Sequence, residues 1–142
     1  MEKKKDEEFI GTWELSSIET RDETGDLVKR GKRKGYLIYS PEGYMSVSFM
    51  KEDRPRFKSD DIRGGTIEEK IAAINGYISY AGKYTVHDET MIHHIEVSLF
   101  PNWVGETQER MYHLEGNQLT LSTPLMLVGG KRLSTHIVWE KV

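Results

Sequence analysis

The chain has 142 residues and a mass of 16.4 kDa, which fits one domain with a single hydrophobic core. Charged residues make up 30% and hydrophobic residues 37%, and the formal net charge is −3, which argues against a disordered chain and against a nucleic-acid partner. Cysteine is absent, which excludes disulfides, thiolate metal sites and a cysteine nucleophile.

The N-terminal residues 2–8 are all charged, so we expect residues 1–8 to be a mobile leader and not a secretory signal. No apolar run reaches the length of about 18 residues that a membrane-spanning helix needs. With the absence of cysteine, these features predict a cytoplasmic protein that forms one domain over residues 1–142. These features do not decide whether the protein forms a homodimer.

Alternating polar and apolar residues predict eight strands separated by turn residues. After the first strand, the basic residues 29–35 are interpreted as a solvated loop. Ser40-Pro41-Glu42-Gly43 has proline and glycine at favoured turn positions and predicts a hairpin. The expected strands are residues 9–19, 36–39, 44–50, 77–86, 90–98, 106–114, 118–123 and 133–139.

One short helix is expected near residues 67–75, after a polar loop over residues 51–65. Thr66 and Glu69 have the spacing of a capping box, and Asn75-Gly76 is a typical helix end. Eight sequential antiparallel strands joined by short turns favour an all-β fold, an eight-stranded antiparallel up-and-down barrel. Such a barrel has room inside for side chains or for one small ligand.

Several motifs along the chain resemble the microbial family of short lipocalin-like domain proteins. They are Gly11-Thr12-Trp13-Glu14-Leu15, the run from Gly35-Tyr36 to Met45-Ser46, Tyr80-Ala81-Gly82-Lys83-Tyr84, His94-x-Glu96-x-Ser98, Pro101-Asn102-Trp103-Val104-Gly105 and Gln108-x-Arg110. The resemblance covers nearly the whole chain. It implies a lipocalin-like (calycin) barrel with Trp13 at its closed end and a generic role in holding a small ligand.

Strand alternation places His94, Glu96 and Ser98 on one face of their strand. A symmetric loop around Asn102 sets His94 opposite Arg110 and Glu96 opposite Gln108, with Tyr112 on the same face. The turn at Gly116 and a predicted two-residue turn at Gly129-Gly130 add Thr120, Ser122 and Trp139 to this face. The sequence leaves open whether this face lines the lumen. In the alternative, it is the outer wall and the core consists of Met91, Ile95, Val97, Met111, Leu119 and Leu121.

If the polar face points inward, Glu96 is the expected carboxylate partner of Arg110, since a lone buried guanidinium is costly. Arg110 is then a natural clamp for a carboxylate or enolate oxygen of a ligand. Aromatic side chains supply flat walls with polar tips. The predicted ligand-binding residues are Tyr44, Tyr80, His94, Glu96, Trp103, Gln108, Arg110, Tyr112 and Trp139.

The leading functional prediction is a barrel that holds a small, largely apolar or aromatic molecule. The sequence does not decide whether this molecule carries an acidic group. The alternative is a cofactor-free isomerase or cyclase in which His94 and Glu96 act as acid and base and Arg110 stabilises negative charge. A weaker third possibility is an accessory domain with a packed interior that binds another protein. No metal site, cofactor motif or nucleophilic triad is predicted.

Overall fold

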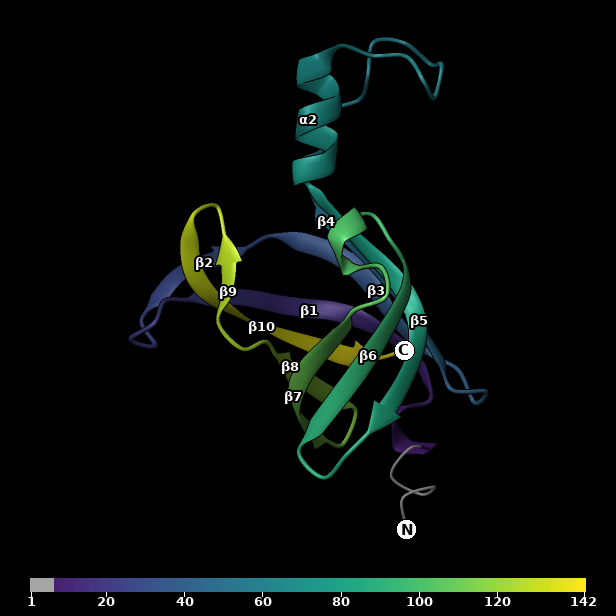
Figure 1. The fold of residues 1–142 in the computed structure, drawn as a ribbon, viewed down its shortest axis with the longest axis vertical. Coiled ribbons are helices and arrows are strands. Elements are labelled where there is room, and N and C mark those ends of the chain that lie inside the picture. The colour runs from purple at the N-terminus through teal and green to yellow at the C-terminus, as the bar shows by residue number, and fades with distance from the viewer. Residues whose placement is uncertain (1–6) are drawn as a thin grey trace.

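The structure, a computed structural model, describes residues 7–142 as one antiparallel sheet that closes into a barrel (Figure 1). The order of hydrogen-bonded neighbours is β2-β1-β3-β4-β5-β6-β7-β8-β10-β9, and an additional pairing of β1 with β10 closes the wall. The strands are β1 (Gly11–Arg21), β2 (Leu27–Gly31), β3 (Arg33–Tyr39), β4 (Tyr44–Lys51), β5 (Tyr77–Val86), β6 (Thr90–Ser98), β7 (Thr107–Glu115), β8 (Gln118–Ser122), β9 (Met126–Val128) and β10 (Lys131–Lys141).

The predicted eight-stranded barrel is confirmed, with two additional short strands. β2 pairs with the second half of β1, and β9 pairs with the start of β10. The interpretation of residues 29–35 as a loop was wrong, because β2 and the start of β3 occupy them. Nearly every residue of β2 is exposed, so this charged edge strand lacks the apolar alternation that marks a strand in sequence. The proposed leader over residues 1–8 lies mostly outside the described residues.

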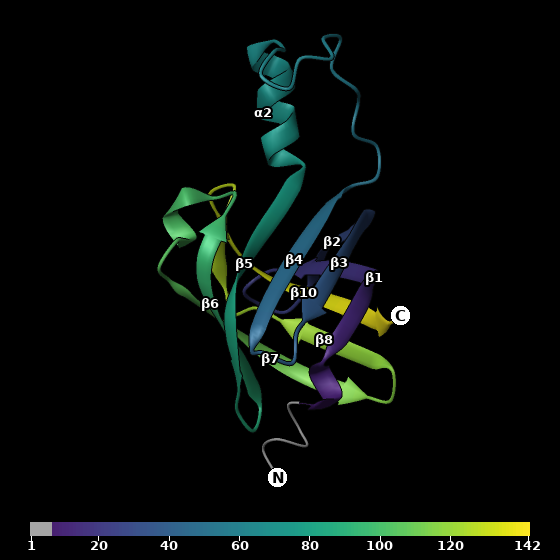
Figure 2. The same cartoon turned by 90° about the vertical axis from the view of Figure 1, so that its right-hand side faces the viewer.

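Helix α2 (Ile67–Asn75) has the predicted boundaries and the predicted capping box. The Glu69 backbone N–H donates to Thr66 Oγ1 at 3.1 Å, and the Thr66 N–H donates to Glu69 Oε1 at 2.8 Å. The helix projects away from one end of the barrel (Figures 1 and 2). Its apolar stripe of Ile67, Ile71 and Ile74 is therefore exposed and forms no part of the barrel core.

The opposite end of the barrel is closed by large aromatic side chains. Trp13 is fully buried, and its Nε1–H donates to the Phe9 carbonyl at 2.9 Å. The Phe9 ring packs edge-on against Tyr39 and Tyr112 at 6.1 and 4.9 Å. The start of β1 lies at the end away from α2 (Figures 1 and 2), so this aromatic cluster fills that end of the barrel, and the cavity described below lies toward the α2 end.

A β-bulge between β5 and β6 decides which residues of β6 face the lumen. Ala81 pairs with Val97 whereas Gly82 pairs with Ile95, so Glu96 is an extra residue without a partner on β5. His93 and Ile95 are buried, whereas Glu96 and Val97 are exposed. The prediction that His94, Glu96 and Ser98 share one face was wrong, because strict alternation does not pass through a bulge.

The β6–β7 register also differs from the prediction. His93 lies opposite Gln108 and Met91 opposite Arg110, whereas a symmetric loop had placed His94 opposite Arg110. The connecting loop contains the 3-10 helix η1 (Pro101–Trp103), which shifts the pairing by an odd number of residues. An odd shift exchanges the two faces of one strand relative to the other, so Arg110 shares the lumen with His93.

The β8–β10 pairing contains a similar shift. The predicted two-residue turn at Gly129-Gly130 is confirmed, since Val128 pairs with Lys131. Beyond that turn, however, one extra residue near Pro124 moves the register, and Leu121 pairs with Ile137 and Leu119 with Trp139. The predicted inward position of Trp139 is therefore correct, but leucines replace Thr120 and Ser122 on the lumenal face.

We predict that Gly82→Ala destabilises the fold by about 2–3 kcal/mol, because an added Cβ would overlap the His94 carbonyl oxygen across the bulge. Gly31→Ala is the matched control, since its Cβ would meet only side-chain atoms of Ile18 and Arg33. Urea denaturation measures both variants. Equal stability of the two variants would contradict the close approach of the backbones at the bulge.

Candidate functional site

The interior of the barrel contains a cavity of about 590 Å³ toward the α2 end. Side chains from β1, β3–β8 and β10 line its walls. Most of them are apolar, among them Leu37, Val47, Leu121, Ile137 and Trp139. Its volume lies within the range of about 300–1,000 Å³ that is typical of small-molecule sites. The barrel is therefore a container and not a fully packed plug.

Aromatic residues of the loop after β6 form part of the cavity rim. Trp103 in η1 contacts the Tyr80 ring edge-on at 5.7 Å and the Phe100 ring at 5.5 Å. Residues of β9 complete the lining on the other side. Figures 1 and 2 show η1 and the β9–β10 hairpin at the same end of the barrel as α2. A ligand at this end would contact flat aromatic surface on entry.

A buried histidine lies between two tyrosines inside the barrel. The Tyr39 hydroxyl is 2.7 Å from His93 Nε2, and the Tyr80 hydroxyl is 2.7 Å from His93 Nδ1. His93 is only 1% exposed. Burial lowers the pKa of His93 to about 3, and the neighbouring Arg110 and His94 act in the same direction. The imidazole is therefore neutral at physiological pH, with one ring nitrogen as a donor and the other as an acceptor.

Arg110 is a buried cation with no counter-ion among residues 7–142. It is 8% exposed, and its Nη1 donates to Gln108 Oε1 at 3.2 Å and to the Glu109 carbonyl at 3.0 Å. Within residues 7–142, no carboxylate lies at ion-pair distance from it, and the cavity lining contains no Asp or Glu. Glu96, the expected partner, is exposed on the outer face. A buried guanidinium without an anion is costly, which makes Arg110 the strongest candidate for a ligand contact.

Two more donors belong to the same cavity. The Trp139 indole N–H is buried and has no hydrogen-bond partner. Leaving such a group unsatisfied costs about 1–3 kcal/mol. Arg33 also lines the cavity, and its partial burial lowers the pKa of its guanidinium. The polar part of the cavity is thus rich in donors.

The structure brings together four of the predicted site residues, Tyr80, Trp103, Arg110 and Trp139, in the lining of the cavity. Gln108 lies beside them and accepts a hydrogen bond from Arg110. Tyr112 lies further toward the closed end, where its ring packs on Phe9 and its hydroxyl donates to the carbonyls of His87 and Asp88. Whether any of these residues binds a ligand stays a prediction.

Tyr44, His94 and Glu96 lie on the outer wall, so the alternative in which the predicted binding residues all face the lumen is wrong for these three. Tyr44 is 49% exposed, and the Lys83 ammonium lies 5.7 Å from its ring on the outer wall. His94 Nε2 lies 3.2 Å from Thr85 Oγ1, in an exposed hydrogen bond. The acid–base pair that the isomerase or cyclase alternative needs is therefore outside the cavity, separated by the wall from Arg110. The bulge opposite Gly82 and the odd β6–β7 shift explain this outcome.

Sequence reasoning missed His93, Tyr39 and Arg33 as site residues. A signal for His93 was present, because Met91, His93 and Ile95 alternate on the apolar face that the outer-wall alternative assigned to the core. That alternative was correct for Met91, Ile95, Leu119 and Leu121, but Val97 and Met111 are exposed. The lumen thus contains residues from both alternatives, the inward polar face and the apolar core.

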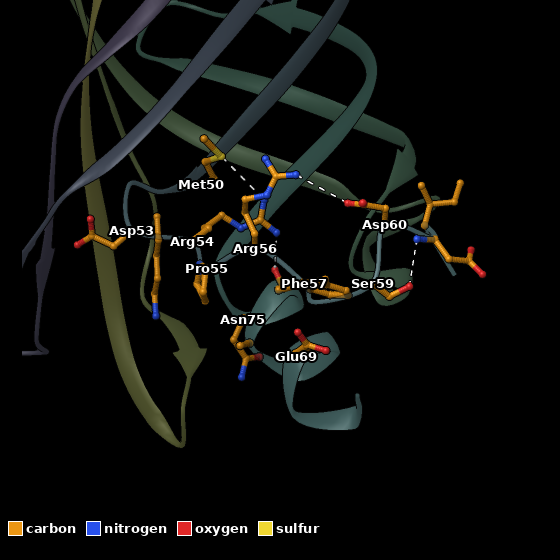
Figure 3. Close-up of a pocket in the computed structure, with 15 residues that line it drawn as sticks. Met50, Asp53, Arg54, Pro55, Arg56, Phe57, Ser59, Asp60, Glu69 and Asn75 are labelled. Atoms are coloured by element: carbon orange, nitrogen blue, oxygen red, sulfur yellow. Dashed lines mark hydrogen bonds and ion pairs between the residues drawn. The ribbon is translucent and has the colours of Figure 1, made fainter. Parts of the chain in front are cut away.

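A second pocket, of about 800 Å³, lies outside the barrel between the loop over residues 52–65 and α2 (Figure 3). Arg56 forms an ion pair with Asp60 at 3.8 Å, and both side chains are more than nine-tenths exposed. Arg54 donates to the Ala73 carbonyl at 3.2 Å. Because acidic and basic residues alternate around this pocket and water reaches them, we assign the candidate site to the barrel cavity.

Neither a membrane-spanning helix nor a metal cluster is found in the described part of the chain. No helix within residues 7–142 has the length and apolar character to cross a bilayer. In the same residues, no three His, Asp or Glu side chains gather closely enough to hold a metal ion.

The closed antiparallel barrel with an apolar cavity defines a small-molecule-binding barrel. Residues 10–142 match the model of a family described as "Lipocalin-like domain", and the chain belongs to this family. It is also 36% identical over 108 residues to the 4'-hydroxy-3'-methoxypropiophenone carrier protein ppsC of Aspergillus oryzae, a match that covers 69% of this chain and 96% of that protein. The family resemblance seen in the sequence motifs is therefore confirmed.

The lowered pKa of His93 predicts a pH dependence of stability. Between about pH 6.5 and 3 the unfolded chain binds a proton that the folded protein excludes, so the free energy of unfolding falls as the pH drops through this window. The slope from this group approaches about 1.4 kcal/mol per pH unit. His93→Gln should reduce the slope between pH 6 and 5 relative to the unmodified protein. Denaturation at several pH values measures this, and an unchanged slope in His93→Gln would contradict a neutral buried imidazole.

Proposed function

We propose that this protein binds and carries a small, largely apolar, aromatic molecule in the barrel cavity. The observation that carries the proposal is the 590 Å³ cavity inside a closed wall, lined mainly by apolar and aromatic side chains. Burial of a ligand there removes apolar surface from water on all sides, which favours binding by about 25 cal/mol per Å². A rim of Trp103 and Phe100 suits a planar ring at the entrance.

The similarity to a carrier of an aryl ketone supports the same class of ligand. An aryl ketone has a flat ring for the apolar walls and a carbonyl oxygen that accepts hydrogen bonds. The cavity offers donors from Tyr80, Arg110 and Trp139 for such an oxygen. We therefore include aromatic ketones and phenols among the ligands that we propose.

Carriage is favoured over catalysis because the residues proposed for acid–base chemistry lie outside the cavity. His94 and Glu96 are on the outer wall, and the cavity histidine, His93, has a pKa of about 3, far from the range that suits a general base at neutral pH. We also propose a cytoplasmic location, with which the absence of cysteine is compatible. The proposal does not specify the oligomeric state.

We predict that a cavity-filling substitution weakens binding. Leu121 lines the cavity, so Leu121→Trp should weaken binding of the neutral fluorescent probe N-phenyl-1-naphthylamine at least about tenfold. Val97→Trp is the matched control, because Val97 is 67% exposed on the same barrel. Probe fluorescence measures affinity, and displacement by 4'-hydroxy-3'-methoxypropiophenone tests the aryl ketone class. Circular dichroism and thermal unfolding verify that both variants fold.

Equal probe affinity in Leu121→Trp, Val97→Trp and the unmodified protein would contradict binding inside the barrel. Native mass spectrometry of the protein purified from its own host provides an independent test. A co-purifying small molecule with an aromatic ring would support the proposal, and a large flexible lipid would contradict it.

A further inference from the structure

The hydrogen-bond arrangement around His93 fixes the direction in which the Tyr80 hydroxyl donates. Both tyrosine hydroxyls keep their protons, because burial raises the pKa of Tyr39 and of Tyr80. The neutral imidazole has one donor and one acceptor, so one tyrosine donates to it and the other accepts from it. Only the tyrosine that accepts from His93 retains a free O–H for another partner.

Burial decides which tyrosine this is. Tyr39 is 1% exposed and does not line the cavity, and its hydroxyl forms a hydrogen bond with His93. If Tyr39 accepted from His93, its own O–H would be buried without an acceptor, which is costly. Tyr39 therefore donates to His93 Nε2, and His93 Nδ1–H donates to the Tyr80 oxygen. The Tyr80 O–H is left to donate into the cavity that its side chain lines.

Arg110 completes this donor group. Its guanidinium is close enough to the Tyr80 hydroxyl to offset part of the rise in the pKa of Tyr80. Arg110 Nη1 donates to the Gln108 side chain and to the Glu109 carbonyl, and the guanidinium also interacts with the Tyr80 hydroxyl. The lining contains Arg33 and Arg110 but no Asp or Glu. The positive charge of Arg110 thus lies beside a directed O–H donor in a cavity whose lining is mostly apolar.

We infer that the cavity selects ligands with an anionic oxygen, a carboxylate or an enolate or phenolate oxygen, which Arg110 and the Tyr80 hydroxyl bind together. Tyr39 and His93 are positioning residues that direct the Tyr80 proton toward that oxygen. This inference rests on the proposed function, because it assigns the chemical class of the ligand for the same cavity. It also explains why a buried guanidinium is tolerated without a carboxylate from residues 7–142: the ligand supplies the anion.

The test compares three probes of nearly equal shape at pH 7: 2-naphthoate, 2-naphthamide and 2-ethylnaphthalene. Displacement of N-phenyl-1-naphthylamine measures the affinity of each. We expect 2-naphthoate to bind about 10- to 100-fold more tightly than 2-naphthamide, since charge-assisted hydrogen bonds are the stronger kind. Equal affinity of the acid and the amide would overturn the inference while the proposed function stands. Failure of all three probes and of the fluorescent reporter to bind would overturn both.

Variants assign the preference to the proposed residues. Arg110→Met should reduce the ratio of naphthoate to naphthamide affinity to about one, with little change for 2-ethylnaphthalene. Arg132→Met is the matched control, because Arg132 is an exposed residue of β10 outside the cavity lining, and it should keep the ratio. Tyr80→Phe, which removes only the hydroxyl, should lower the ratio by about 3- to 10-fold. An unchanged ratio in Arg110→Met would overturn the inference.

Tyr39→Phe tests the positioning role separately. Without the Tyr39 donor, His93 Nδ1 becomes free to accept from Tyr80, which turns the Tyr80 proton away from the cavity. We expect the naphthoate preference to fall by several-fold while the affinity for 2-ethylnaphthalene stays unchanged. A variant that lost packing alone would weaken all three probes equally, and that result would overturn the positioning role.

Discussion

Closure of the sheet is the constraint on which the rest of this structure depends. In a closed barrel each strand residue faces either the lumen or the outside, so the hydrogen-bond register between neighbouring strands sorts every side chain into one of two environments. The pairing of β1 with β10 closes the wall, and the bulge at Gly82 and the shift near Pro124 set the register on either side of the lumen. These local irregularities, more than the number of strands, determine what a ligand would meet.

The lumen combines two opposite requirements. Its closed end is filled by Phe9, Trp13 and other large side chains, which supply the buried apolar surface that stabilises the fold. Its open end retains space and a buried cation, neither of which favours folding. Such a division is typical of a binding protein, in which one half of the core stabilises the fold and the other half forms the ligand-binding cavity. The neutral His93 between two tyrosines joins the two halves.

Membership of the lipocalin-like domain family accounts for the barrel fold, whereas the residues of the cavity determine which ligands can fit it. The hydrogen-bond donors of the cavity come from β3, β5, β6, β7 and β10, and their arrangement depends on long-range strand pairing. A donor-rich, acid-free cavity and an aromatic rim are properties of this chain's own residues. These properties are the basis of the proposal that the ligand is an aromatic molecule with an electron-rich oxygen.

The sequence by itself determined the local features. Helix α2 begins and ends where its capping box and Asn75-Gly76 predict, the turns at Gly43 and Gly129-Gly130 are formed, and the barrel architecture follows from the strand pattern. The motifs also indicated the family. These features depend on residues close together in the chain, where propensity and turn geometry act directly.

Only the tertiary structure decided which faces point inward. Arg110 and Trp139 lie in the cavity lining, as the inward alternative requires, whereas His94, Glu96 and Tyr44 lie on the outer wall and His93, which was not a candidate, faces the lumen. One extra residue in a bulge or a loop exchanges the two faces of a strand, and the sequence pattern does not specify that residue. The packing of eight strands around a common lumen fixes it, because the closed wall tolerates only the register that buries Leu119, Leu121 and Ile95 together.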